Sequence, residues 1–175
     1  MPATRAELTA FLDGLGIAWT TIEHPAVFTV AESQFLRARI AGGKSKNLFL
    51  KDRKGRLFLF VAEDEAEIDL KTLHLKLGAQ GRFSFASAEL LREVWGVEPG
   101  SVTPFGAIND AQGRVTVALD AGLLAHGTVN FHPLQNTATT ALAADDLVRF
   151  LRATGHEPLI VPREGAPAGS GAIPD

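Results

Sequence analysis

The sequence predicts an α/β (α+β) fold: a single domain over residues 1–161 with a mixed, curved β-sheet flanked by helices. Strand and helix patterns are interleaved along a chain of 175 residues, a length that one hydrophobic core can serve. A hairpin signal with a glycine at 52–56 requires antiparallel pairing beside any parallel crossover. Hydrophobic residues make up 46% of the chain and charged residues 21%, as in an ordinary globular protein.

Capping patterns define the first elements. A Thr-x-x-Glu capping box occurs at 4–7 and again at 29–32. The first box opens a helical apolar pattern that stops at Gly16, and the second predicts a helix that runs to about Arg39. Between them, the segment 19–23 predicts a short strand.

The middle of the chain predicts a hairpin followed by short helices. The apolar runs 47–50 and 57–62 are expected to be buried strands. A helix over 69–78 begins at an aspartate cap and ends at a glycine. A brief strand over 83–85 leads to a helix over 87–95 that begins at a serine cap.

The remaining elements are predicted in the same way. The segment 96–106 holds three glycines and two prolines, which indicates a tightly specified turn system. Strands are expected at 115–119 and 158–161, and a helix at 145–154. Residues 162–175 are rich in Gly, Ala and Pro and are expected to form a flexible tail.

Composition excludes several classes of function. The chain has no cysteine, so disulfides, thiolate nucleophiles and cysteine-ligated zinc are excluded. The five histidines lack the spacing of metal ligands, so we expect no metal and no other cofactor. No G-x-S-x-G motif or complete phosphate-binding loop occurs. Without a secretory signal or a membrane-spanning apolar run, we expect a cytoplasmic monomer that does not bind membranes.

The charge distribution leaves one basic segment. A net charge of −3 argues against a general nucleic-acid binder. Lysines and arginines nevertheless crowd residues 44–56, whereas acidic residues collect at 63–69. This asymmetry could steer a polyanion toward one face, although such basic runs are usually just a solvated surface hairpin.

The densest polar signal lies between Val129 and Leu142. A strand over 128–131 runs into His132-Pro133, and the proline should end it or cause a bulge. Because side chains at strand ends reach clefts, His132 and Asn136 are candidates for a pocket. A lone histidine is also commonly a satisfied core residue, and the polar residues alone do not decide between the two.

A second candidate lies at the mouth of a predicted buried strand. Lys46 and Asn47 stand where burial of a cation must be offset by a partner. The lysine could equally extend to water beside the hairpin.

Three ordered motifs together resemble a known family. They are G-K-S-K-N-L-F-L-K-D at 43–52, G-S-V-T-P at 100–104, and V-N-F-H-P-L-Q-N-T-A-T-T at 129–140. Up to about Val161 the chain is similar to the free-standing prolyl-tRNA editing proteins, the ProX group of the YbaK/ProRS-associated domain family. The third motif resembles the branch that hydrolyses alanine mischarged on proline tRNA.

The resemblance implies a deacylase whose substrate is an aminoacylated tRNA, most specifically Ala-tRNA(Pro). It makes Lys46 the essential lysine and His132 a pocket element, and we take these two as candidate catalytic residues. The candidate substrate-binding residues are Val27, Phe28, Thr29, Asn47, Gly100, Ser101, Val102, Thr103, Pro104, Phe131 and Asn136.

The chemistry is consistent with these residue types. An aminoacyl ester is already activated, so its hydrolysis needs positioned water and stabilisation of the developing oxyanion. Lys46 and backbone donors of the 100–104 turn could supply this, or Lys46 could anchor the phosphate of the terminal adenosine. His132 is expected to orient and wall the pocket rather than to act as a general base. A pocket that admits a methyl group and rejects the proline ring would act as a second sieve.

Two other functions stay open. The protein could deacylate another small residue, cysteine or serine, on tRNA(Pro), or it could be a non-catalytic tRNA-binding module. Prolyl-tRNA synthetase or an elongation factor is the expected protein partner.

Overall fold

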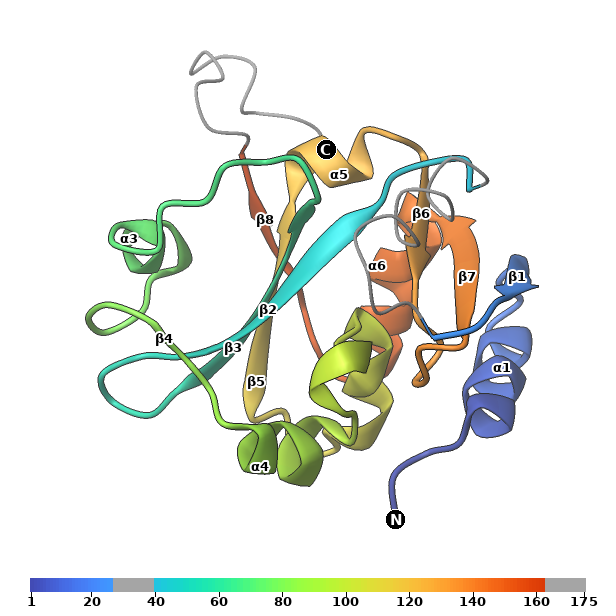
Figure 1. Ribbon diagram of the computed structural model, residues 1–175, viewed down its shortest axis with the longest axis horizontal. Helices are drawn as coiled ribbons and strands as arrows, with labels where there is room; N and C mark the ends of the chain where they lie inside the picture. Colours follow the sequence, from blue (N-terminus) through green and yellow to red (C-terminus); the bar gives the residue numbers. More distant parts are fainter. Residues whose placement is uncertain (27–39, 163–175) are drawn as a thin grey trace.

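The computed structural model describes residues 1–26 and 40–162 (Figure 1). The helix predicted from the second capping box lies outside these residues, and so do Val27, Phe28 and Thr29 and nearly all of the predicted tail. Within the described part, no helix is long and apolar enough to span a membrane.

The elements follow the predicted interleaved order. In chain order they are α1 (Arg5–Gly14), β1 (Trp19–Glu23), β2 (Ser45–Lys51), β3 (Leu57–Glu63), α3 (Leu73–Leu77), β4 (Ser84–Phe85), α4 (Ala88–Leu90), the π-helical turn η1 (Leu91–Trp95), the 3-10 helices η2 (Pro99–Ser101) and η3 (Pro104–Asn109), β5 (Val115–Asp120), α5 (Ala121–Leu124), β6 (Thr128–Phe131), β7 (Ala138–Ala143), α6 (Ala144–Ala153) and β8 (Leu159–Val161).

The strands form two sheets. One has the order β1-β7-β6 and is antiparallel, and the other has the order β4-β2-β3-β5-β8. In the larger sheet β2 pairs antiparallel with β3 and β4, while β3, β5 and β8 run parallel to one another. An isolated parallel bridge between Gly43 and Val129 joins the two sheets. The predicted α+β fold with mixed pairing is therefore confirmed.

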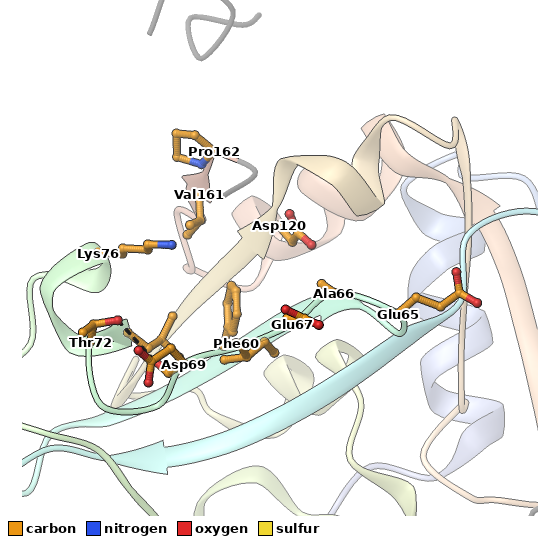
Figure 2. Close-up of a pocket in the computed structure, with 12 residues that line it drawn as sticks. Phe60, Glu65, Ala66, Glu67, Asp69, Thr72, Lys76, Asp120, Val161 and Pro162 are labelled. Atoms are coloured by element: carbon orange, nitrogen blue, oxygen red, sulfur yellow. Dashed lines mark hydrogen bonds between the residues drawn. The ribbon is translucent and has the colours of Figure 1, made fainter. Parts of the chain in front are cut away.

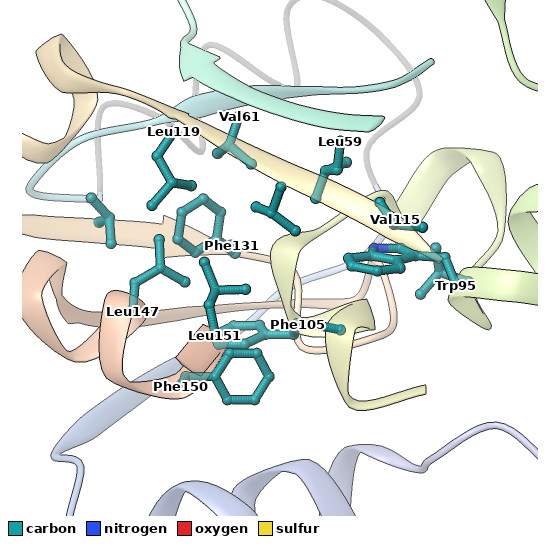
Figure 3. Packing of buried hydrophobic residues seen from close by; sticks show 14 of the residues in the cluster. Leu59, Val61, Trp95, Phe105, Val115, Leu119, Phe131, Leu147, Phe150 and Leu151 are labelled. Carbon is teal, nitrogen blue, oxygen red and sulfur yellow. The ribbon is translucent and has the colours of Figure 1, made fainter. Parts of the chain in front are cut away.

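Two cores lie on opposite faces of the larger sheet. The main core receives alternate residues of β3, including Leu59 and Val61, and packs them against α1, η1, η3 and α6. At its centre the ring of Phe105 contacts those of Phe131 and Phe150 edge-on, with centroids 5.9 and 5.4 Å apart (Figure 3). The intervening β3 residues face a smaller cluster beneath α3.

Strand β7 was not predicted. The sequence shows only a dense polar signal between Val129 and Leu142, yet Ala138–Ala143 is the central strand of the smaller sheet. Threonine is β-branched and suits a strand, and burial requires only that its hydroxyl find a partner. The hydroxyls of Thr140 and Thr21 lie 2.8 Å apart across β7 and β1 and satisfy each other.

Two predicted helices differ in their bounds. The helix expected from residue 69 begins at Leu73, because the Asp69 carboxylate accepts from Lys71 N and closes a turn instead. The helix expected over 87–95 begins at its predicted cap, Ser87, but ends in the π-helical turn η1.

The glycine- and proline-rich segment is the predicted tight turn system. The Trp95 indole donates to the carbonyl of Thr103 at 2.7 Å, and Asn109 Nδ2 donates to the carbonyl of Trp95 at 3.0 Å. A Cβ on Gly106 would lie 2.2 Å from the Trp95 ring, so only glycine fits there. The segment after η1 is thereby fixed against the core.

Candidate active site

Asn130 joins the segment that carries Lys46 to the segment that carries His132. Its side-chain Nδ2 donates to the carbonyls of Ala41 and Gly43, at 2.8 and 3.1 Å, and its backbone N–H donates to Gly43 at 3.1 Å. With 8% of its surface exposed, Asn130 is a buried amide whose donors are satisfied by backbone acceptors. The two halves of the predicted site therefore meet through hydrogen bonds.

Glycines at 42 and 43 permit this close approach. Gly42 has φ +91°, and a Cβ there would lie 2.8 Å from the carbonyl oxygen of Thr128. A Cβ on Gly43 would already be 3.0 Å from the His126 and Leu123 side chains. Because a side chain at Gly42 would force β6 and the start of β2 apart, the Gly-Gly pair is required for the junction.

Strand alternation places Lys46 and Asn130 on the same side of the joined sheets. Phe49 on β2 and Phe131 on β6 both belong to the main core. Residues of opposite parity therefore face away from that core, and these include Lys46 and Asn130. His132 follows two residues after Asn130, directly beyond the end of β6.

The ammonium group of Lys46 is held by a backbone acceptor. Its Nζ donates to the carbonyl of Ala66, in the segment that follows β3. A lysine ammonium has three N–H donors, so this contact leaves it able to donate to a further group. Lys46 is only partly exposed, and its positive charge is therefore more effective than a fully solvated one.

A cavity of about 300 Å³ lies beyond Ala66, between β3, α3 and β8 (Figure 2). Its walls include the carboxylates of Glu65, Glu67, Asp69 and Asp120. The Asp120 carboxylate accepts from Gly122 N at 2.9 Å and Glu63 N at 3.0 Å, so its role is structural. Because these walls are predominantly acidic, the cavity is not suited to a nucleic-acid phosphate.

His132 is held as a neutral imidazole with a defined tautomer. Its Nδ1 lies 3.0 Å from the carbonyl of Ala138, which can only accept, so Nδ1 carries the proton. Nε2 then has a free lone pair and no hydrogen-bond partner among the described residues. Burial, above all, and the neighbouring charge of His24 lower the pKa of His132, against the opposing effect of the Ala138 hydrogen bond.

His24 is a site residue that the sequence reasoning missed. Its ring centroid lies 6.2 Å from that of His132, and its Nε2 lies 2.9 Å from the hydroxyl of Thr139. Nδ1 donates to the carbonyl of Pro25 at 2.9 Å, so Nε2 accepts from the Thr139 hydroxyl when the ring is neutral. The available signal was a second His-Pro dipeptide at 24–25, directly after the predicted strand over 19–23.

The 100–104 turn meets the loop after His132 at one point. A Cβ on Gly100 would lie 3.5 Å from Asn136 Nδ2, so these two predicted residues are adjacent. The side chains of Ser101, Thr103 and Pro104 are buried, and that of Val102 packs against the main core. Gly100, backbone atoms of this turn and the partly exposed Val102 are therefore the parts that a ligand could contact.

Two further predicted residues point away from Lys46. Phe131 is 3% exposed and packs against Phe105, so its side chain is part of the main core rather than a wall on the Lys46 side. The side chain of Asn47 points to the opposite face of β2 from that of Lys46, and its Nδ2 donates to Ser45 Oγ at 3.1 Å. Its buried Oδ1 has no hydrogen-bond partner among the described residues.

Comparisons with known proteins identify the family of this chain. The aminoacyl-tRNA editing domain family matches residues 24–150. The chain is 40% identical over 148 residues to the prolyl-tRNA editing protein ProX of Acetoanaerobium sticklandii, covering 84% of this chain and 90% of that protein. It is 38% identical over 161 residues to the prolyl-tRNA synthetase associated domain-containing protein 1 of Mus musculus, covering 90% and 95%.

A solved structure of a candidate trans-editing enzyme for prolyl tRNA synthetase has the same fold. The TM-score is 0.68 at 22% sequence identity, over 93% of this chain and 99% of that one. The family match, which spans most of the chain, includes both His24 and His132 as well as Lys46. The chain therefore belongs to the aminoacyl-tRNA editing domain family.

Proposed function

We propose that this protein hydrolyses the aminoacyl ester of mischarged tRNA in trans, and that its substrate is Ala-tRNA(Pro). Membership of the editing family and 40% identity to a prolyl-tRNA editing protein support the reaction class. The observation that carries the proposal is the junction at Asn130. It joins the segment before the Lys46 strand to the strand that ends at His132, and we infer that one ester contacts both side chains.

Lys46 supplies the positive charge in this proposal. When water adds to the ester carbonyl, negative charge develops on the carbonyl oxygen, and a donor placed there stabilises the transition state more than the substrate. The Ala66 carbonyl keeps Nζ in place and leaves further N–H groups for the oxyanion. If Lys46 instead binds the phosphate of the terminal adenosine, its loss misplaces the ester. The rate of hydrolysis then also falls.

His132 orients a hydroxyl group in this proposal. Its Nε2 lone pair can accept a hydrogen bond from the attacking water or from the ribose hydroxyl next to the ester. The lowered pKa keeps the ring neutral at neutral pH, which preserves the acceptor. The C–O bond to the ribose then breaks, and the tRNA oxygen leaves with a proton as free alanine is released.

Selection against proline is proposed to come from exclusion. Substrates whose apolar side chains differ by one methylene group differ by only about 1–3 kcal/mol in binding free energy. Synthetases therefore use a second site that excludes by size. Walls from His132 and the Gly100–Asn136 contact would admit a methyl group and reject a pyrrolidine ring. The candidate residues Val27 and Phe28 lie outside the described residues. Cysteine and serine are close to alanine in size and are the competing substrates.

A deacylation panel tests the proposal. Purified protein is incubated with Ala-, Pro-, Cys- and Ser-tRNA(Pro) in the presence of a chelator. We expect release of alanine while Pro-tRNA(Pro) stays intact. Faster release of cysteine or serine would reassign the substrate. Intact esters together with measurable tRNA binding would instead make the protein a non-catalytic tRNA-binding module.

A further inference from the structure

The β2–β3 hairpin presents unpaired positive charge at one end of the large sheet. The turn between β2 and β3 projects at the edge of the molecule, beside β4 (Figure 1). Arg53, Lys54 and Arg56 are exposed there, and Lys51 is partly exposed. No carboxylate of the described residues forms an ion pair with any of these four cations.

The acidic residue within this hairpin is turned inward. Asp52 is 4% exposed, and its carboxylate accepts from the backbone N–H groups of Lys54, Arg56 and Gln80, each at 2.9 Å. Burial alone would raise the pKa of Asp52, but these three donors and the charge of Arg56 lower it overall. The carboxylate is used to shape the turn, and the outer surface of the hairpin is left basic.

An exposed aromatic side chain lies at the base of the same hairpin. Phe85 on β4 pairs with Leu50 on β2, and 61% of its surface is exposed. A single exposed phenylalanine is not unusual, but an exposed aromatic residue on a strand paired to a basic hairpin is a combination that nucleic-acid surfaces use. The cations bind phosphates and the ring contacts a base.

The distance from Lys46 to the hairpin matches the distance from the ester to the first base pairs of a tRNA. Lys46 and Lys51 lie on the same strand, and a strand rises about 3.3 Å per residue, so they are about 17 Å apart. A stacked nucleic-acid strand advances about 3.4 Å per phosphate, so this span corresponds to about five nucleotides. If the ester lies at Lys46, the hairpin lies beyond the unpaired 3′ end, beside the first base pairs.

We propose that the β2–β3 hairpin and Phe85 form the docking surface for the base-paired acceptor stem of the substrate tRNA. Arg53, Lys54 and Arg56 contact phosphates of the stem, and Phe85 packs on the nucleotide where the stem meets the unpaired 3′ end. The inference rests on the proposed function for its choice of tRNA as the occupant. The cavity of Figure 2, between β3, α3 and β8, has mostly acidic walls and is not suited to phosphates.

The first experiment measures binding of uncharged tRNA(Pro) by fluorescence anisotropy at several salt concentrations. The Arg53→Gln, Lys54→Gln double variant should bind at least tenfold more weakly. The slope of log K against log salt should fall by about 1.8, because each duplex-phosphate contact contributes about 0.9. The charge-matched control is Lys71→Gln with Arg92→Gln, two exposed cations elsewhere on the surface. It should keep the wild-type affinity and slope.

The Phe85→Ala variant separates the aromatic contact from the ionic ones. We expect about tenfold weaker binding, as for loss of one base–aromatic contact. The salt slope should not change, since no charge is removed. The side chain is largely exposed, so the melting temperature should stay near the wild-type value. If this variant binds tRNA with wild-type affinity, Phe85 is not part of the docking surface.

A second experiment separates docking from catalysis. An alanyl ester of a short oligonucleotide that contains only the unpaired 3′ end should be hydrolysed equally by wild type and the double variant. Full-length Ala-tRNA(Pro) should show a lower kcat/KM with the variant. If wild type and the double variant bind tRNA equally well, the proposed docking surface is wrong. It is also wrong if the charge-matched control weakens binding as much as the double variant does. If wild type hydrolyses neither ester, the proposed function fails while the binding data still decide the surface.

Discussion

The backbone N–H and the side-chain amide of Asn130 both donate to the carbonyl oxygen of Gly43, each at 3.1 Å. Asn130 lies on the strand that leads to His132, and Gly43 lies just before the strand that carries Lys46. Two segments far apart in sequence are thereby held in one register. The relative placement of the two candidate catalytic residues depends on this contact.

Replacing Asn130 should loosen the junction. In Asn130→Ala the carbonyls of Ala41 and Gly43 lose a buried donor, which should cost about 1–3 kcal/mol in the free energy of unfolding. Urea unfolding measures this, and kcat/KM should fall by a larger factor than stability alone explains. Gln135→Ala, which removes an exposed side chain, is the control. An Asn130→Ala protein with wild-type stability would contradict the role assigned to Asn130.

Replacing Lys46 should abolish most of the proposed activity without unfolding the protein. Removal of one donor to a developing oxyanion typically costs about 10²–10³-fold in rate, and we expect a loss of that size in Lys46→Ala. Lys46→Arg keeps the charge and should recover part of the rate. Lys71→Ala, an exposed lysine elsewhere, serves as the control. Turnover of Ala-tRNA(Pro) at the wild-type rate by Lys46→Ala would exclude Lys46 from the reaction.

The pH dependence should report the ionisation of His132. Because its pKa is lowered from the ordinary 6.5, the ring stays neutral in the folded protein until the pH falls below that value. The rate should therefore decline on the acid side with a midpoint under 6.5, as Nε2 gains a proton. His132→Gln should be slower and lack this decline. An NMR titration of the imidazole with a midpoint above 6.5 would refute the assignment.

The same ionisation of His132 should lower the free energy of unfolding as the pH falls. The unfolded chain protonates His132 at its ordinary pKa, whereas the folded protein resists protonation until a lower pH. Stability from this group is thus fully present above 6.5 and is lost as the pH falls through the folded-state pKa. His132→Gln should flatten this part of the stability curve.

Gly106→Ala tests the turn system that follows η1. The added Cβ would lie 2.2 Å from the Trp95 ring, whose indole is fixed by its hydrogen bond to Thr103. We expect a loss of about 1–3 kcal/mol in unfolding free energy, the usual cost of overpacking a core. Gly14→Ala is the matched control, since no atom lies within 4 Å of its added Cβ. A Gly106→Ala protein as stable as this control would show that the turn can shift.

Much of the secondary structure could be predicted because its determinants are local. The capping box of Thr4 and Glu7 forms with both of its hydrogen bonds, and Ser87 caps its helix as predicted. Gly55 in the β2–β3 turn has φ +83°, the conformation for which a glycine was expected. Each of these features depends on residues a few positions apart, so one sequence suffices to read them.

Features that depend on distant partners could not be predicted. Strand β7 was missed because its threonines look polar until Thr21 on β1 provides a partner for Thr140. Phe131 was expected at the pocket, but Phe105 draws it into the main core. His24 gained its place beside His132 only through the pairing of β1 with β7.

The sequence by itself determined the α+β class, most helix and strand positions, and the three motifs that resemble the editing family. Only the tertiary structure decided which side of the sheet each motif residue occupies. A shift of one residue in strand register turns every side chain to the opposite face. That register is set by the Gly43–Val129 bridge and the Asn130 hydrogen bonds, which no local pattern encodes.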